Sequence, residues 1–211
     1  PEKAVTERAT LDAILDAGRV AHLAMTADGQ PYALPVGYAR DGDRVLVHGS
    51  PASRLLRGGA KGLDMCLTVT HLDGLVLARS AFHHSVNYRS VVVVGRAARL
   101  DDLDERRAAL DVLVESIVPG RPADARPPSE KELRGTTVLA LPLDEASVKV
   151  RTGGPLDEDE DMDLPVWAGV IPMAQVPGVP VADPAQVPAQ PVPAYATSYA
   201  RPGHVPRASG P

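Results

Sequence analysis

The sequence predicts a mainly β protein, an antiparallel barrel with a few flanking helices. Hydrophobic residues make up 44% of the 211 residues but aromatic residues only 3%, so the core has to be built from Val, Leu and Ala. That composition favours strands and short helices. Asp-Gly dipeptides separate several strand-like runs, and they supply the positive φ values that tight hairpin turns require. The four consecutive valines Val91–Val94 predict a central strand that is buried on both faces.

The expected elements alternate short strands with tight turns. A first helix begins at a Thr6 cap and ends at Gly18, which we expect in the left-handed conformation. A second helix covers residues 102–118, and a short helical piece follows near 129–133. Strand signals lie in residues 19–26, 31–39, 44–48, 63–71, 75–79, 88–97, 136–143 and 146–151. With Asp73-Gly74 as one of the hairpin turns, we expect five to seven of these runs to form strands of a closed or nearly closed antiparallel barrel.

The composition divides the chain into three parts. Residues 1–152 form the predicted barrel domain, and residues 153–171 hold an acidic loop, 157–163, together with the one tryptophan. From residue 172 to 211 there are ten prolines in forty residues, so this part cannot form a packed core by itself. We expect it to be an extended Pro-rich C-terminal arm lying on a partner subunit, with a disordered tail as the alternative.

Charge and cysteine content exclude several classes of protein. The formal net charge is −5 and Lys and Arg do not cluster, which argues against nucleic acid as a partner. The single cysteine, Cys66, excludes an internal disulfide, lies in an apolar run where we expect a buried core thiol, and fits a reducing compartment. No signal peptide is evident and no apolar run approaches the ~20 residues of a spanning helix. We therefore expect a soluble cytoplasmic protein without a membrane partner.

The stretch Val45–Gly59 carries the strongest local signal for a ligand. Ser50 stands where a helix N-cap belongs and Pro51 where the first helical residue belongs. Ser53 and Arg54 then add a hydroxyl and a guanidinium in the first turn. A helix start with these side chains favours an anion, so we expect a phosphate to bind here.

Three features in combination resemble the pyridoxamine 5′-phosphate oxidase-like FMN-binding split-barrel flavoproteins, over residues 5–150. They are a meander whose third strand ends in His-Gly, a short helix bearing Ser and Arg, and the strand Tyr-Arg-Ser-Val-Val-Val-Val-Gly. The branch that contains the nitroimidazole-resistance proteins looks most similar. The resemblance implies an FMN-binding split barrel of antiparallel Greek-key type. It also implies a homodimer with two FMN molecules in clefts at the interface.

The resemblance assigns cofactor contacts by position. Ser53 and Arg54 match the family's phosphate cluster, although a second basic residue expected beside the arginine is replaced by Leu55. Arg89 and Ser90 match a pair that gives polar contacts to the flavin or its phosphate. The remaining expected contacts border the flavin ring or its phosphate and are Pro35, Val36, Gly37, Val47, His48 and Ser50. The family's residues for recognising pyridoxal phosphate have no evident match, so a vitamin B6 oxidase activity is not expected.

Two further side chains have both a functional and a structural interpretation. His48 is the candidate catalytic residue, because a neutral imidazole beside the cofactor can donate a proton or hold a substrate oxyanion; the alternative is a histidine that bonds the backbone at a strand end. Trp167 can stack over the flavin or cover a neighbouring subunit's cleft, and the alternative is a buried structural tryptophan. The adjacent His83 and His84 make a poor chelate, so no metal site is expected.

The sequence thus predicts an FMN-dependent oxidoreductase acting on a small-molecule substrate that the sequence does not identify. No nucleophile motif, metalloprotease helix or nucleotide-triphosphate loop occurs, as expected if a flavin carries the chemistry. A first alternative is a non-catalytic protein that binds or stores a flavin, a deazaflavin or haem, with His48, His71 or His84 as the axial ligand. A second alternative is a dimeric interaction protein whose arm is the functional part.

Overall fold

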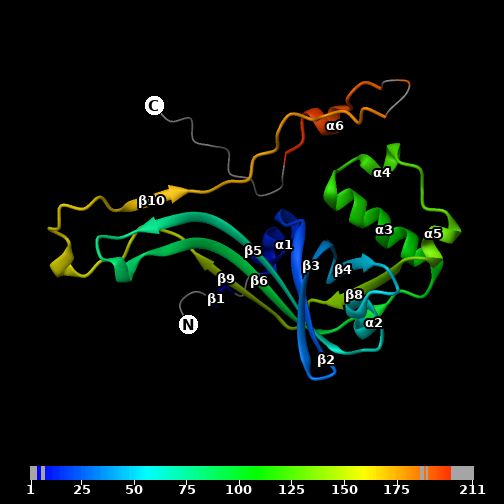
Figure 1. Cartoon of the computed structure of the whole chain (residues 1–211), viewed down its shortest axis with the longest axis horizontal. Coiled ribbons are helices and arrows are strands. Elements are labelled where there is room, and N and C mark those ends of the chain that lie inside the picture. Colours follow the sequence, from blue (N-terminus) through cyan, green and yellow to red (C-terminus); the bar gives the residue numbers. More distant parts are fainter. Residues whose placement is uncertain (1–3, 6–7, 186–187, 189, 201–211) are drawn as a thin grey trace.

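The computed structural model describes residues 4–5, 8–185, 188 and 190–200, and in these residues the strands form one antiparallel sheet (Figure 1). Along the sheet the order is β1-β9-β6-β5-β2-β3-β4-β8-β7, and β10 pairs with β5 beside this path. The strand bounds are β1 Ala4–Val5, β2 Val20–Ala27, β3 Gln30–Asp41, β4 Arg44–Gly49, β5 Asp64–Leu77, β6 Ser85–Arg96, β7 Ala98–Arg99, β8 Thr137–Pro142, β9 Ala146–Arg151 and β10 Gly169–Pro172. The predicted fold class, a mainly β split barrel with few helices, is confirmed.

The sheet divides at β3, where the strand changes partner. Residues 30–37 of β3 pair with β2, and residues 38–41 pair with β4. β8 then returns to pair with β4, a crossover that a simple meander does not have. Val, Leu and Met side chains from β2, β4, β5, β6 and β8 fill the interior of the curled sheet.

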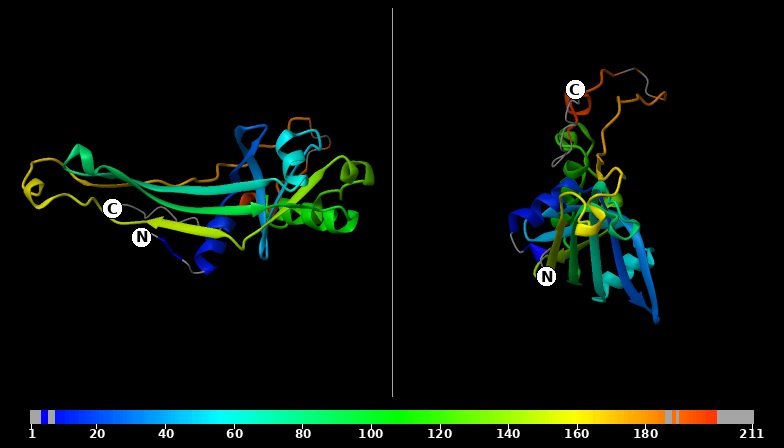
Figure 2. Two further views of the ribbon diagram at one scale, coloured as in Figure 1. Left: turned by 90° about the horizontal axis from the view of Figure 1, so that it is seen from below. Right: turned by 90° about the vertical axis from the view of Figure 1, so that its left-hand side faces the viewer.

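Helices cover the barrel at one end and on one outer face (Figure 2). α1, Arg8–Ala17, buries Ile14 and Leu15 against the barrel core. α3, Leu103–Ile117, covers the outer face of β3, β4 and β8, where a second apolar cluster forms around Leu46 and Leu113. The short helices are α2 Arg54–Ala60, α4 Arg121–Asp124, α5 Glu130–Arg134 and α6 Ala194–Thr197.

β5 and β6 form a long two-stranded ribbon that extends well past the barrel (Figure 1). The predicted hairpin at Asp73-Gly74 is wrong, because β5 continues through these residues with a register shift between Leu72 and Gly74. A glycine inside a strand marks a bulge or a close approach as well as a turn. Here a Cβ on Gly74 would meet Val170, so the glycine lets β10 pack closely, and the chain reverses later, at the 3₁₀ helix Ala81–His83.

Two smaller expectations about the first part of the chain are corrected. Gly18 does end α1, but its φ is not positive; its Cβ position is occupied by the Tyr38 hydroxyl, so close packing explains the glycine. Cys66 is partly exposed on the outer face of β5, opposite Ala24, rather than in the core. The predicted cap Thr6 lies outside the described residues.

The segment after β9 runs along the ribbon and then back to the helices. Its acidic loop is anchored by Asp157, which accepts hydrogen bonds from the main-chain N–H groups of Arg79 and Ser80 and is paired with the Arg79 guanidinium at 3.0 Å. β10 follows, and the Pro-rich arm returns to α3 and α4 (Figure 1), where Tyr195 accepts a hydrogen bond from Arg121. The arm is extended, as predicted, and within the described residues it lies on its own chain. The boundaries 1–152, 153–171 and 172–211 stay a prediction.

No helix in the described residues is long and apolar enough to cross a membrane.

Candidate functional site

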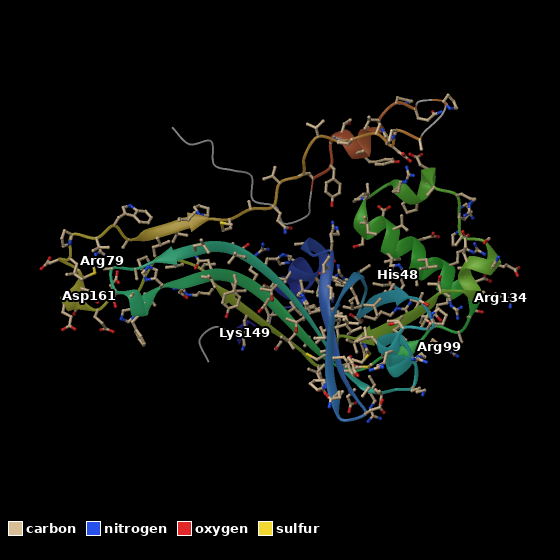
Figure 3. The ribbon with its side chains drawn as sticks, viewed as in Figure 1. His48, Arg79, Arg99, Arg134, Lys149 and Asp161 are labelled. Atoms are coloured by element: carbon tan, nitrogen blue, oxygen red, sulfur yellow. The ribbon has the colours of Figure 1, made fainter. Side chains whose placement is uncertain are left out.

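The predicted site residues fall into two groups that lie apart in the single chain. One group surrounds the junction of β3, β4 and α2, and the other lies along the β5–β6 ribbon. Figure 3 shows His48 close to the helices, while Arg79 and Asp161 mark the far end of the ribbon.

The turn before α2 differs from the predicted helix start. Ser50 accepts a hydrogen bond from the Ser53 N–H through its carbonyl at 2.9 Å, and its Oγ accepts one from the Ala52 N–H at 3.2 Å. Residues 50–53 therefore form a β-turn with Pro51 at its second position, and the helix begins only at Arg54. Ser-Pro is favoured in both structures, which is why the sequence did not separate them. The Ser50 N-cap prediction is wrong by three residues.

Arg54 stacks on an aromatic ring that the sequence analysis did not select. Its guanidinium lies 5.0 Å from the centre of the Tyr32 ring, and its Nη1 donates a hydrogen bond to the Tyr32 hydroxyl. Tyr32 comes from β3, so this contact joins α2 to β3. Leu55, which stands where the family has a second cation, is buried in the barrel core instead. Nothing in the spacing of Tyr32 and Arg54 along the chain indicated that they would meet.

Cationic side chains continue from this contact along α2 and to Lys61, the residue just after its end. Arg57 and Lys61 follow Arg54 at spacings of three and seven residues, so they lie on one side of the helix. Both are exposed, and neither has an ion pair among the described residues. Ser53 is partly exposed at the start of the same helix. These residues make a positively charged strip beside β3.

β3 has an unpaired edge next to α2. Its residues 30–37 pair with β2 on one side, and β4 takes up the other side only from Tyr38 onward. The main-chain groups of Pro35, Val36 and Gly37 on that side thus have no strand partner within the described chain. Leu34 is 48% exposed and a Cβ on Gly37 would meet open space, so a flat ring has room to lie against this edge.

His48 and Val47 face opposite sides of β4. Val47 is buried in the barrel core, so any contact with a cofactor would come from its main chain. His48 lies opposite Val138 of β8, on the face that α3 covers farther along the strand, and its ring at the strand end is partly covered by protein but stays accessible to solvent. Partial burial lowers the pKa of the imidazole below its usual value, which favours the neutral ring near pH 7.

Arg89, Ser90 and Trp167 lie in the ribbon group. Arg89 is held by Asp73 in a bidentate pair at 2.8 and 2.9 Å, which raises its pKa, and Ser90 is buried. Arg89 is six residues along β6 from Gly95, about 20 Å in a strand, and Gly95 pairs with the start of β5. Trp167 is 66% exposed beside β10, so it is not a buried structural tryptophan. A single chain does not bring these residues to the α2–β3 junction.

Two histidines of the ribbon have one ring nitrogen held by a main-chain carbonyl. His71 Nε2 lies 2.9 Å from the Ile14 oxygen, and His84 Nδ1 lies 3.0 Å from the Ser80 oxygen. With the proton on Nδ1, the exposed His84 ring presents its Nε2 lone pair outward. Phe82, beside it, is 88% exposed.

The fold defines a split-barrel protein. At the junction of α2 with β3, Arg54 and Tyr32 lie in contact beside an unpaired strand edge. Residues 7–150 match the family model described as pyridoxamine 5′-phosphate oxidase, and the chain belongs to this family. A search of the curated proteins gives no match.

Three solved structures define the similarity further. The FAD and heme binding protein from Mycobacterium smegmatis is 39% identical, with 92% of this chain and 95% of that chain covered and a TM-score of 0.88. The flavocytochrome Anf3 from Azotobacter vinelandii is 42% identical, with 92% and 90% covered and a TM-score of 0.87. A protein described as a 5-nitroimidazole antibiotic resistance protein from Bacteroides thetaiotaomicron shares the fold at 20% identity, with 70% and 86% covered and a TM-score of 0.58.

Proposed function

We propose that this protein is a flavin-dependent oxidoreductase whose cofactor lies between α2 and the open edge of β3. The observation that carries the proposal is the Arg54–Tyr32 contact beside that edge. A flavin has an anionic phosphate and a flat polar ring, and the junction offers a match for each. The names of the two structures that are 39% and 42% identical, a FAD and heme binding protein and a flavocytochrome, support the same class.

The residues present fit a flavin phosphate. Ser53 supplies a hydroxyl and Arg54 a planar guanidinium, which pairs with two phosphate oxygens at once. The Tyr32 ring and hydroxyl contact the Arg54 guanidinium and hold its side chain in place. Main-chain groups of Pro35–Gly37 supply hydrogen bonds to the ring edge, and a bound flavin would supply hydride or electron transfer there.

The number of cations favours a dinucleotide. The sequence analysis predicted FMN, which carries one phosphate. The positively charged strip continues past Arg54 to Arg57 and Lys61, and neither of these is paired with an acidic side chain in the described residues. Both are therefore available to bind a second phosphate. Because the M. smegmatis structure is named for FAD, we propose FAD as the flavin.

A second copy of the chain completes the site. The register places six exposed apolar residues on the outer face of the sheet and ribbon, namely Val20, Leu72, Leu75, Val86, Val94 and Ile171. An uncovered apolar face of this length is typical of a subunit interface. In a two-fold dimer built on it, the ribbon of each chain lies across its partner, and Trp167 and Ser90 can approach the partner's cofactor. Arg89 alternates to the opposite face of β6, where Asp73 holds it, so its predicted flavin contact is not explained by this interface.

His48 is proposed as the residue that handles a proton near the cofactor. Its lowered pKa keeps the ring neutral at neutral pH, so one nitrogen accepts and the other donates. The proposed role is to hold or protonate a substrate oxygen. The small-molecule substrate and the cytoplasmic location stay part of this proposal.

Haem binding is a second candidate function, favoured by His84. A metal-bound histidine commonly has its other ring nitrogen fixed by a carbonyl, as Ser80 fixes Nδ1 of His84. The exposed Phe82 and Trp167 supply apolar surface at the same end of the ribbon. We propose His84 as an axial ligand, ahead of His48 and His71.

The absorbance spectrum of freshly purified protein tests both candidates. We expect the absorbance bands of an oxidised flavin, and mass spectrometry of the released ligand should give FAD. A Soret band that is lost in His84→Ala and kept in His83→Ala supports haem at the proposed ligand. Colourless protein that does not take up added FAD or FMN would overturn the flavin proposal.

A further inference from the structure

Gly37 of β3 differs from the other glycines in the described strands. At those other positions a Cβ would meet a side chain at 3.7 Å or less, and they are Gly49, Gly74, Gly95 and Gly169. At Gly37 a Cβ would have no neighbour within 4 Å, and the φ of this residue is not positive. Neither the backbone conformation nor packing within the described chain therefore requires a glycine here. A strand glycine of this kind marks a close approach by a ligand or by another chain.

The side chains around Gly37 come from β2 and β3. Val20 pairs with Gly37 and His22 pairs with Pro35, and paired residues of antiparallel strands project from the same face. Leu23, the next residue of β2, is buried in the barrel core, so Val20 and His22 lie on the outer face, where both are exposed. The result is a flat patch with no side chain at its centre. We call it the Gly37 patch, and its residues are Val20, His22, Pro35 and Gly37.

The His22 imidazole is free to contact a ligand on this patch. Within the described part of the chain it has no hydrogen bond and no ion pair. Diagonal neighbours across antiparallel strands lie about 7 to 8 Å apart, which is within reach of an aromatic side chain, so the ring can extend toward the space over Gly37. The Gly37 patch thus has an apolar part, Val20 and Pro35, and one polar group.

The patch lies next to the place where we propose the cofactor. Tyr32, which contacts Arg54, precedes Gly37 by five residues on β3, so the two residues face opposite sides of the strand. The edge of β3 between them has no strand partner on the α2 side, because β4 pairs only from Tyr38 onward. A cofactor with its phosphate on Arg54 can therefore pass around this edge and place a flat ring over Gly37.

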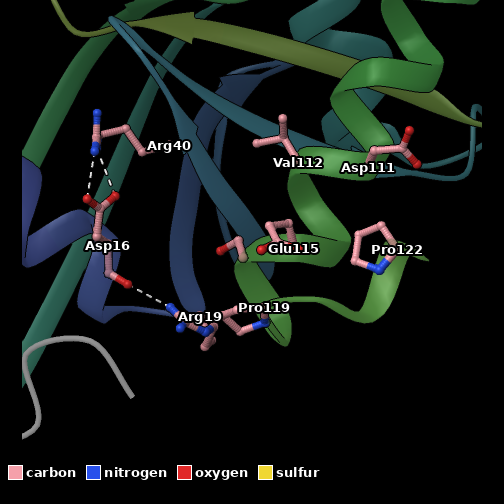
Figure 4. Close-up of a pocket in the computed structure, with 9 residues that line it drawn as sticks. Asp16, Arg19, Arg40, Asp111, Val112, Glu115, Pro119 and Pro122 are labelled. Atoms are coloured by element: carbon pink, nitrogen blue, oxygen red, sulfur yellow. Dashed lines mark hydrogen bonds and ion pairs between the residues drawn. The ribbon is translucent and has the colours of Figure 1, made fainter. Parts of the chain in front are cut away.

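A pocket elsewhere near the start of β2 is a poorer place for the ring. It has a volume of about 590 Å³, and Figure 4 shows that Asp16 and Arg40 in its wall pair with each other, at 2.6 and 2.8 Å. Arg19, in the same wall, donates to the main-chain carbonyl of Asp16. Asp111 and Glu115 line the other side and would repel a phosphate. The charges of this pocket thus suit an anionic cofactor less well than those around α2.

We propose that His22 contacts the flavin, with an imidazole N–H that donates a hydrogen bond to the polar edge of a ring lying over Gly37. This inference rests on the proposed function and adds a contact that the family resemblance did not assign. Hydrogen bonds to the ring tune a flavin, and a donor binds more strongly where there is more negative charge. Because the ring oxygens and nitrogens are more negative in reduced flavin, His22 should favour the reduced form.

Gly37→Val tests the position of the ring by filling the patch. We expect titration of the flavin-stripped, full-length variant to show at least about tenfold weaker FAD binding than the wild type. The melting temperature of the flavin-free variant should stay the same or rise, because valine is favoured over glycine in strands and a Cβ has space here. Gly154→Val, at an exposed glycine that also has open space around it, is the matched control and should bind FAD normally.

Two results for Gly37→Val would overturn the position of the ring. One is FAD affinity equal to that of the wild type. The other is a monomer where the wild type is a dimer, which would assign the Gly37 patch to the subunit interface. If the variant does not fold, Gly37→Ala provides the same comparison with a smaller side chain.

His22→Leu tests the hydrogen bond, since leucine keeps the bulk of the side chain and removes the donor. We expect the preference for reduced over oxidised FAD to fall at least about threefold, and the absorbance bands of bound oxidised FAD to shift. His22→Gln keeps an N–H and should recover part of both effects, whereas His83→Leu, at the ribbon end, should match the wild type. An unchanged preference and spectrum in His22→Leu would contradict the proposal. Wild-type protein that binds neither FAD nor FMN would instead overturn the proposed function itself.

Discussion

At the scale of single residues, the site depends on a few side chains whose partners are far away in the sequence. Arg54 was predicted from its place in the first turn of a helix that follows a strand, and the structure keeps it at the start of α2. Tyr32 was not predicted, because it belongs to a different strand and only the curl of the sheet brings it to Arg54. A local pattern thus identified the charged group but not the ring that positions it.

The same limit explains the wrong helix cap. Ser50 and Pro51 satisfy the rules for a helix start and for a turn, and the choice is made by main-chain hydrogen bonds that sequence does not show. Because the helix begins at Arg54, the proposed anion site depends on the cationic side chains. The amide groups of a longer helix no longer contribute to it.

His48 gives a prediction about pH. Because burial lowers its pKa in the folded state, the unfolded chain binds more protons between the folded pKa and the ordinary value of 6.5. Stability should therefore rise with pH across this interval and fall when the pH drops below about 6.5. Thermal unfolding at pH 8 and pH 5 should show a smaller loss in His48→Gln than in the wild type. Equal losses in the two proteins would show that the ring is not desolvated.

At the scale of elements, the long ribbon is the feature that sequence reasoning missed. Asp73-Gly74 has the composition of a turn, yet the strand passes through it because β10 packs on Gly74 and β6 pairs on the other side. A contact with a strand almost a hundred residues later decides the structure of this dipeptide. The bounds of α3, in contrast, follow from local periodicity and were predicted within one residue at each end.

Asp157 fixes the end of the ribbon and carries the second prediction. Its side chain is 1% exposed and joins the acidic loop to Arg79 and Ser80. Asp157→Asn removes the charge that both donors share, so residues 157–168 should exchange amide hydrogens at least tenfold faster than in the wild type. Asp159→Asn, in the same loop, is the control. Unchanged exchange in Asp157→Asn would mean that β10 alone holds the loop.

At the scale of the whole molecule, two features point beyond a single chain. Exposed apolar residues lie on one outer face from β2 along the ribbon to β10, and the predicted contacts divide between the α2 end and the ribbon. One chain does not bring these two groups together, and the proposed dimer would do so. The family resemblance predicted this arrangement, whereas composition and periodicity did not.

The dimer prediction concerns the outer face. Leu75→Arg places a charge between Val86 and Ile171 on the apolar outer face. We expect analytical ultracentrifugation to give a monomer for this variant at concentrations where the wild type is a dimer. Leu156→Arg, which replaces a more exposed apolar residue outside this face, should remain dimeric. A wild-type monomer at tens of micromolar, or a dimeric Leu75→Arg, would contradict the proposed interface.

The most direct measurement for the flavin site is a titration of flavin-stripped, full-length protein with FAD, followed by flavin fluorescence. We expect Arg54→Ala to weaken FAD binding at least about tenfold, because a charge-assisted phosphate contact is lost, and Arg134→Ala to bind as the wild type does. If Arg54→Ala binds FAD with wild-type affinity, the phosphate does not lie between α2 and β3, and the site described here is not the flavin site.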